Sequence, residues 1–124
     1  IRGICCLIPG QKYSRNIRVT RIVDTFLEHA RIWYFGNGGN PKLFLGSPDW
    51  MRRNLYRRIE AVTPILDPDA KQELIDMLSI QLSDKRKACF VDENLHNCWK
   101  SAHPLKEKVR SQYTFYEYLK ERIE

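Results

Sequence analysis

One histidine, His29, has both the chemistry and the sequence position of a reaction site. It lies in the segment Phe26-Leu27-Glu28-His29-Ala30-Arg31, where a short predicted helix over residues 25–29 passes into a predicted strand over residues 31–35. Junctions of this kind often carry functional residues. Imidazole can accept a phosphoryl group, donate a proton to a leaving oxygen, or bind a phosphate as imidazolium, and a helix C-terminus favours the protonated ring. The alternative is a packed or surface histidine without a chemical role.

A dense group of arginines follows, and guanidinium is well suited to binding phosphate. Four arginines lie within the seven residues 52–58, and their forked donors match pairs of phosphate oxygens without ever losing charge. Arg58 is the strongest candidate among them. It falls in a predicted strand over residues 55–62, whose alternation places it on the same face as Glu60. Two alternatives stay open, a solvated basic surface and a simple ion pair between Arg58 and Glu60.

Arg2 is a third candidate for phosphate binding. It precedes the apolar run Ile4-Cys5-Cys6-Leu7-Ile8, which Pro9-Gly10 closes. Such a run is typical of a strand that is buried on both faces. An arginine at the end of this strand can hold a phosphate beside a cleft or can simply be exposed, and the pattern alone does not decide between the two.

The sequence lacks other familiar catalytic or metal-binding patterns. The glycine-rich segment over residues 36–39 has no Gly-Lys-Ser/Thr ending and lies between two predicted strands, so it predicts a hairpin turn. Ser47 and Asp49 suit a turn cap better than a direct catalytic role. We predict no metal site in this chain, because the cysteines have no zinc-binding spacing. They are expected to be free thiols: Cys5, Cys6, Cys89 and Cys98.

Composition favours one small globular domain over residues 1–124. The chain is 43% hydrophobic and 29% charged, so it can form a packed core. Its net charge of +6 favours a polyanionic partner such as polyphosphate, a nucleotide or nucleic acid. No signal peptide is apparent and no apolar run approaches the ~20 residues that span a bilayer. We therefore expect a cytoplasmic location, with association to a membrane surface left open.

The order of predicted elements favours an α/β fold in which helices cover a mixed sheet. The second helix has the clearest start, since Asp67 suits its N-cap and Pro68 its first position. Strands are expected over residues 4–8, 17–23, 31–35, 43–45, 55–62 and 88–91. Helices are expected over residues 25–29, 68–83 and 108–123.

Several segments together closely resemble the last domain of polyphosphate kinases. The match extends over most of the chain and weakens between Asp92 and Lys106. The segments that carry it keep the family's order and approximate spacing: Arg2-Gly3-Ile4-Cys5-Cys6-Leu7, Phe26-Leu27-Glu28-His29, Phe35-Gly36-Asn37-Gly38-Gly39, Asp49-Trp50-Met51, Arg58-Ile59-Glu60, Thr63-Pro64-Ile65 and Asp67-Pro68.

The resemblance implies an enzyme that reversibly transfers the terminal phosphate of ATP to inorganic polyphosphate. It also implies a phospholipase-D-like half, truncated at its N-terminal end, that faces a related domain across the active site. His29 matches a histidine that assists a phosphorylated histidine of the earlier domain. Arg2 matches an arginine that contacts the ATP phosphates, and Arg58 matches a basic residue of the same cleft.

The same resemblance implies partners and a cofactor. Mg²⁺ is implied, although nothing here matches its ligands, and the full-length enzymes of the family assemble as homo-oligomers. The partner histidine is absent from this segment, because His96 and His103 lie where the match is weak. We therefore expect the isolated chain to be inactive.

Two alternatives to a kinase stay open. A phospholipase-D-like phosphodiesterase would carry a His-x-Lys motif and a downstream Asp, but Arg31 and Phe35 stand at those positions. A nucleic-acid-binding module without catalysis would fit the charge and the aromatics, yet no nucleic-acid-binding motif is present.

Overall fold

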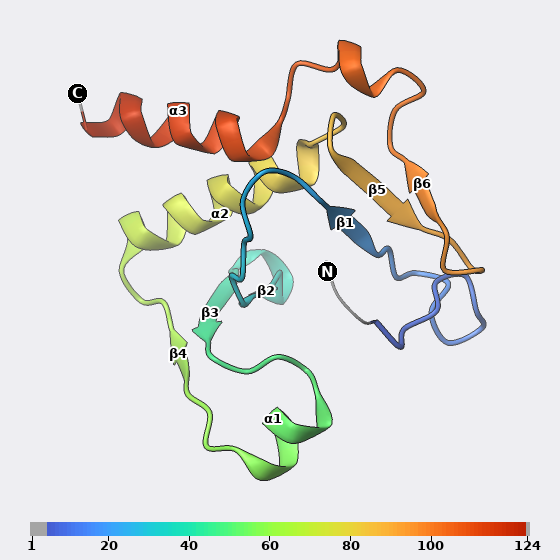
Figure 1. The fold of residues 1–124 in the computed structure, drawn as a ribbon. Coiled ribbons are helices and arrows are strands. Elements are labelled where there is room, and N and C mark those ends of the chain that lie inside the picture. Colours follow the sequence, from blue (N-terminus) through green and yellow to red (C-terminus); the bar gives the residue numbers. More distant parts are fainter. Residues whose placement is uncertain (1–4, 124) are drawn as a thin grey trace. The chain divides into compact units, whose positions relative to one another are not determined.

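The computed structural model describes residues 5–123 and divides into two compact units. The first unit comprises Ile1–Phe26 and Met77–Glu124, and the second comprises Leu27–Asp76. Helix α2 (Pro68–Ser83) contributes residues to both. Strands and helices are interspersed along the chain (Figure 1), which confirms the predicted α/β class. The expectation of a single domain stays a prediction.

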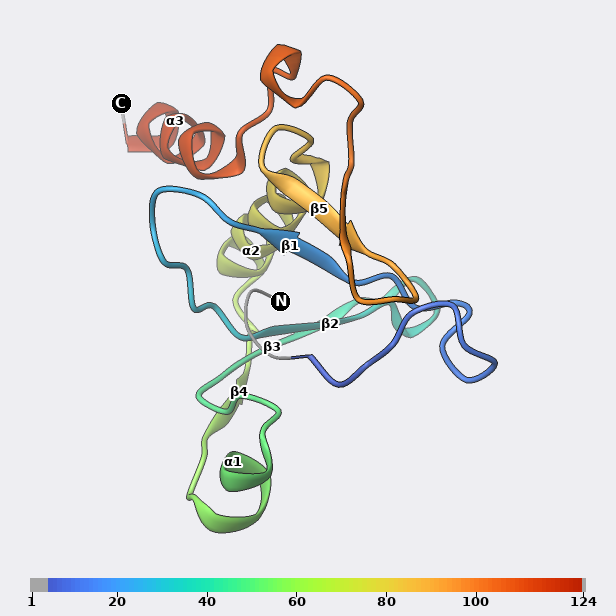
Figure 2. The same ribbon diagram turned by 45° about the vertical axis from the view of Figure 1, so that its right-hand side comes forward.

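An antiparallel sheet in the order β1-β5-β6 forms the centre of the first unit. It consists of β1 (Thr20–Ile22), β5 (Ala88–Val91) and β6 (Asn97–Trp99), and Figure 2 shows β1 and β5 side by side. The buried apolar residues of this unit include Val19, Ala88 and Val91. β1 and β5 confirm two predicted strands, whereas β6 is too short and polar for its sequence to predict it.

A buried carboxylate joins the turn after α2 to the start of α3 (Ser111–Ile123). Asp84 is fully buried, and its Oδ1 accepts hydrogen bonds from the backbone N–H groups of Arg86 (2.8 Å) and Lys87 (2.7 Å). Its Oδ2 accepts a third from the N–H of Ser111 at 2.8 Å. The first N–H groups of a helix have no partner within the helix, so Asp84 caps α3 from a distant part of the chain. A 3₁₀ turn, η2 (Pro104–Lys106), precedes α3.

The second unit contains an antiparallel sheet in the order β2-β3-β4. Its strands are β2 (Ile32–Phe35), β3 (Lys42–Gly46) and β4 (Val62–Pro64). The predicted hairpin between residues 31–35 and 43–45 is confirmed, with the 3₁₀ turn η1 (Asn37–Gly39) at its tip. All three residues of η1 have positive φ angles, which is what an Asn-Gly sequence accommodates at low cost.

Helix α1 (Arg52–Arg57) and then β4 occupy the segment that we predicted as one strand over residues 55–62. The N–H groups of Asn54 and Leu55 donate to the carbonyl oxygen of Met51 (3.0 and 3.1 Å), which closes the first helical turn. Leu55 and Ile59 are four residues apart, and that spacing fits a helix as well as an alternating strand. The strand prediction is therefore wrong up to residue 61, and Arg58 lies at the end of α1.

No helix forms over residues 25–29, because this segment bonds to the start of α3 instead. Arg110 donates to both carboxylate oxygens of Asp24, at 2.6 and 2.8 Å. The side chain of Gln112 binds both the N–H and the carbonyl oxygen of Phe26, at 2.9 and 2.8 Å. These contacts take the polar groups that a helix would need for its own hydrogen bonds.

The predicted strand over residues 4–8 is also wrong where the structure describes it. Residues 5–8 form no strand, and Ile4 lies outside the described residues. Cys6 is exposed and Cys5 is half-buried, in contrast to the burial on both faces that we expected. An extended segment forms a strand only when its backbone hydrogen-bonds to a neighbouring strand. Among residues 5–123, no strand pairs with residues 5–8. All four cysteines are free thiols, as predicted.

We expect Gly46→Ala to destabilise the β2-β3-β4 sheet. A Cβ atom at position 46 would lie 2.6 Å from Cζ3 of Trp33 and 2.9 Å from Cγ2 of Val62, and such overpacking typically costs about 1–3 kcal/mol. Thermal unfolding measures the effect. Gly36→Ala is the matched control, because Gly36 has helical backbone angles and open space around it. Equal unfolding temperatures for the two variants would show that position 46 has more room than the structure indicates.

Candidate active site

His29 lies in the irregular segment that leads from β1 into β2. Its side chain is 60% exposed, so the imidazole is accessible to a ligand. Because residues 25–29 form no helix, the helix-end effect that we expected to favour the protonated ring does not operate here. The electrostatic environment of the imidazole is set by neighbouring side chains instead.

Two side chains contact the imidazole of His29. Its Nε2 lies 2.9 Å from Oδ1 of Asp49 and 2.8 Å from Nη2 of Arg31. Nε of Arg31 donates a hydrogen bond to the same Asp49 oxygen at 3.0 Å. Arg31 Nη2 also lies 3.3 Å from Nδ1 of the ring. These three residues form one connected group, which we call the His29 cluster.

The β2–β3 hairpin brings the His29 cluster together. Ile32 pairs with Leu45, and the N–H of Gly46 donates to the carbonyl oxygen of Arg31 at 3.1 Å. The hairpin therefore holds the segment before β2 beside the segment after β3, which carries Asp49. This register also shows what the sequence analysis missed. It named His29 but neither Arg31 nor Asp49 as its partners, although the predicted hairpin implied that the two flanking segments meet.

The carboxyl group of Asp49 is strongly biased toward its ionised form. Hydrogen bonds from Arg31 and then from His29 lower the pKa of Asp49 from 3.8 to about 2, against the smaller opposing effect of burial. At neutral pH the His29 cluster therefore combines a permanent cation, a permanent anion and an imidazole. This set of groups can bind a phosphate oxygen and can take up or release a proton beside it.

The His29 cluster borders an open hollow of about 590 Å³ in the second unit. His29 and Arg31 supply its charged edge, and the other lining residues are small, apolar or hydroxyl-bearing. They are Ala30, Leu45, Gly46, Ser47, Ala61, Thr63 and Ile65. The hollow leaves room for a ligand in front of the imidazole.

Glu60 has partners other than Arg58. It accepts hydrogen bonds from Oγ of Ser47 and, at 2.7 Å, from Nδ2 of Asn54. These two bonds lower the pKa of Glu60 more than the charge of Arg58 does. Among residues 5–123, Arg58 forms no ion pair, and it is exposed at the end of α1. Arg58 is therefore not one of the side chains that contact the His29 cluster. Arg2 lies outside the described residues.

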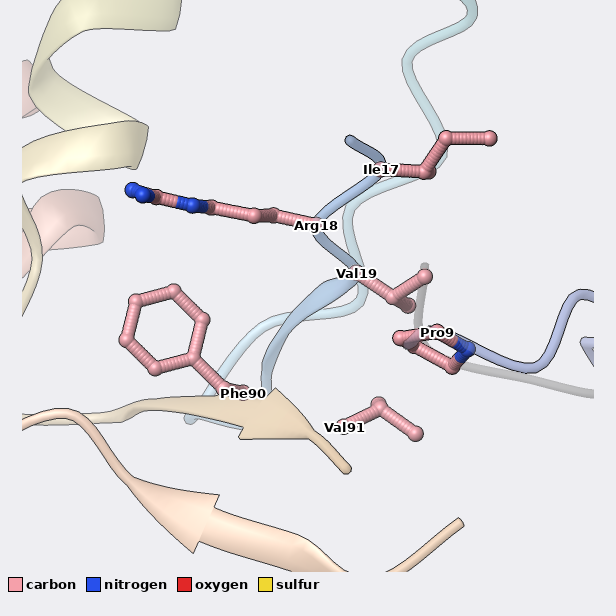
Figure 3. Close-up of a pocket in the computed structure, with 6 residues that line it drawn as sticks. All are labelled: Pro9, Ile17, Arg18, Val19, Phe90 and Val91. Carbon is pink, nitrogen blue, oxygen red and sulfur yellow. The ribbon is translucent and has the colours of Figure 1, made fainter. Parts of the chain in front are cut away.

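A second hollow, of about 380 Å³, lies in the first unit (Figure 3). Its lining is mostly apolar, and in Figure 3 the guanidinium of Arg18 points away from Pro9, Val19 and Val91. Among the described residues that line it, Arg18 is the charged one. This hollow therefore lacks the combination of cation, anion and imidazole found in the second unit.

The described residues offer no metal centre. Within residues 5–123, no group of three or more His, Cys, Asp or Glu side chains is arranged to hold a metal ion. In the same range, none of the helices combines the length and the apolar character that crossing a membrane would require.

Comparison with known proteins gives one consistent result. The family model described as "Polyphosphate kinase C-terminal domain 2" matches residues 1–112. The chain is 46% identical to the polyphosphate kinase of Escherichia coli strain K12 over 121 residues, which cover 97% of this chain and 17% of that protein. It is 45% identical to the polyphosphate kinase of Vibrio parahaemolyticus over the same length. The crystal structure of polyphosphate kinase from Porphyromonas gingivalis matches 97% of this chain and 18% of that chain, with 53% identity and a TM-score of 0.90.

Proposed function

This chain belongs to the polyphosphate kinase family, and from that premise we propose that it supplies one half of an active site. In this site the terminal phosphate of ATP passes reversibly to inorganic polyphosphate, so that ATP is converted to ADP and the polymer grows by one phosphate. The chain spans about 17% of the length of the curated relatives that it matches. The observation that carries the proposal is the His29 cluster, with its accessible imidazole, permanent cation and ionised carboxylate beside an open hollow.

His29 is the residue that we propose to act on the transferred phosphate. Phosphoryl transfer asks little covalent chemistry of a protein, but it requires positioning and neutralisation of charge on the phosphate oxygens. An imidazolium at position 29 would supply a donor and a positive charge, and a neutral ring would supply a base. Arg2 and Arg58 are proposed as further phosphate contacts because they match family positions, and the guanidinium of Arg58 is exposed.

The remaining machinery is proposed to come from other parts of the protein. A histidine of the preceding domain would carry the phosphoryl group, and the assembled enzyme would be a homo-oligomer. Mg²⁺ is the cofactor that the family implies, and because residues 5–123 contain no group of three or more His, Cys, Asp or Glu side chains arranged to hold a metal ion, we assign it to no residue of this chain. A cytoplasmic location remains our expectation for an enzyme that uses ATP.

The proposal is tested with the polyphosphate kinase that contains this chain. It is incubated with polyphosphate and ATP labelled on the terminal phosphate. We expect label in a lengthened polymer together with ADP, and ATP formation from ADP and polyphosphate in reverse. Residues 1–124 alone are expected to be inactive. Hydrolysis of bis(p-nitrophenyl) phosphate without label transfer would support a phosphodiesterase instead, and a salt-sensitive shift of random duplex DNA would support a nucleic-acid-binding module.

A further inference from the structure

We propose that Asp49 is a positioning residue for His29, and that its carboxylate selects which ring nitrogen faces the transferred phosphate. The inference rests on the proposed function of His29. It starts from a single oxygen atom: Oδ1 of Asp49 lies within hydrogen-bond distance of both Nε2 of His29 and Nε of Arg31. An ionised carboxylate can only accept hydrogen bonds, so it favours the neutral imidazole that carries its proton on Nε2.

The tautomer determines what the other nitrogen can do. With the proton on Nε2 and directed at Asp49, Nδ1 carries the lone pair of the neutral ring, and Nη2 of Arg31 lies 3.3 Å from it. Nδ1 can then take up a proton, and as part of an imidazolium it can donate a hydrogen bond to a phosphate oxygen. The side chain of His29 is 60% exposed and lines the hollow. Asp49 would thereby act through His29 without touching the phosphate.

Arg31 gives Nε2 a partner in the opposite protonation state. Its Nη2 lies 2.8 Å from Nε2, and a guanidinium only donates hydrogen bonds. Arg31 can therefore bond to Nε2 when that nitrogen lacks a proton, and Asp49 can bond to it when the proton is present. The ring keeps a partner at Nε2 in both states. In the proposed cycle Nε2 keeps its proton while Nδ1 takes up and releases one, so the contact with Asp49 can hold the ring in one orientation throughout, and a fixed orientation is what efficient proton transfer requires.

Of the charged groups near Arg31, Asp49 is the carboxylate that contacts His29. Glu60 is the other carboxylate that feels the charge of Arg31, but its oxygens are bonded to Ser47 and Asn54. The charge of Arg58 lowers the pKa of Glu60, whereas the side chains that contact the ring of His29 are those of Asp49 and Arg31. Among the described residues, Asp49 is the carboxylate that both His29 and Arg31 contact.

The test compares Asp49→Asn and Asp49→Glu in the polyphosphate kinase that contains this chain. We expect Asp49→Asn to lower kcat for polyphosphate synthesis by about 10- to 100-fold, as loss of an orienting partner does, with a smaller change in KM for ATP. Asp49→Glu keeps the carboxylate and should recover part of the loss. Asp92→Asn is the matched control, because Asp92 also lies beside a histidine, with its Oδ2 3.5 Å from Nδ1 of His96. That variant should keep wild-type activity.

A double variant separates positioning from structural support. If Asp49 acts through His29, adding Asp49→Asn to His29→Ala causes no further loss of activity. A further loss, or a lower unfolding temperature in both backgrounds, overturns the inference. If the His29→Ala background has no measurable rate, equal losses in Asp49→Asn and Asp49→Glu at equal unfolding temperatures overturn it. Wild-type activity in Asp49→Asn overturns the inference about Asp49 and leaves the proposed function intact. Wild-type activity in His29→Ala overturns the proposed function.

Discussion

We expect replacement of His29 with alanine to lower the rate of polyphosphate synthesis by about 100- to 1000-fold, which is the usual loss when a donor that stabilises transition-state charge is removed. The variant loses the imidazole, which borders the hollow and which Asp49 and Arg31 contact. Because the side chain is 60% exposed, its truncation leaves no cavity in a core. Initial rates of phosphate incorporation from ATP measure the loss, and circular dichroism and the unfolding temperature establish that the variant is folded.

His96→Ala is the matched control for this result. His96 is also exposed and also lies beside a carboxylate, that of Asp92, but it belongs to the turn between β5 and β6. We expect this variant to synthesise polyphosphate at the wild-type rate. Near-normal synthesis by His29→Ala would make His29 a structural or surface residue, and our site assignment would then be wrong even though the family is established.

The largest effect on stability is expected from Asp84→Ala. The substitution leaves three backbone N–H groups without their acceptor: that of Ser111, which is buried, and those of Arg86 and Lys87, which are half-buried. Unsatisfied buried donors cost about 1–3 kcal/mol each, so a total of about 3 kcal/mol or more is expected. Hydrogen exchange followed by mass spectrometry measures it locally. Amides of the turn after α2 and of the first turn of α3 should open about 100-fold more often.

Asp69→Ala controls for the loss of an aspartate as such. Asp69 is exposed in the first turn of α2, and surface substitutions of this kind usually change stability by less than about 0.5 kcal/mol. Asp84→Asn should fall between the two, because an amide keeps one acceptor oxygen but not both. Unchanged exchange in Asp84→Ala would mean that water or another side chain replaces the carboxylate at these amides.

The parts of the fold that were predictable have strong local signals. The hairpin of β2 and β3 follows from the Asn-Gly turn and the apolar runs on either side of it. Helix α2 begins where Asp67-Pro68 predicted, and Oδ1 of Asp67 accepts a hydrogen bond from the N–H of Ala70 at 2.8 Å. In both cases the residues that fix the backbone lie within a few positions of the element that they define, so no tertiary contact was needed to predict it.

The failures come from contacts between distant residues. Arg110 and Gln112 form hydrogen bonds with the side chain of Asp24 and the backbone of Phe26. The sequence near residue 25 cannot indicate these partners, because they lie 86 positions away. Over residues 55–62 the difficulty was different, because Leu55 and Ile59 satisfy a helical and an alternating spacing equally. There the local hydrogen bonds to Met51 decided in favour of helix.

The site was only partly predictable for the same reason. His29 was found from its residue type and its place between two elements. Asp49 was assigned to a turn cap from its local sequence, and its contact with His29 was missed because twenty positions separate the two residues in the sequence. The hairpin register was the signal that could have joined them. Residue 32 pairs with residue 45, and continuing that register outward brings the neighbourhoods of His29 and Asp49 together.

The central claim is that this chain contributes His29 to the transfer of the terminal phosphate of ATP. A single-turnover experiment tests it most directly. The enzyme that contains this chain, in excess over ATP labelled on its terminal phosphate, is mixed with unlabelled polyphosphate, and the label in the polymer is followed for wild type and His29→Ala. We predict that the label enters the polymer in the first turnover of the wild type and is slowed by about 100-fold or more in the variant. Equal rates of label transfer in the two proteins would contradict the claim.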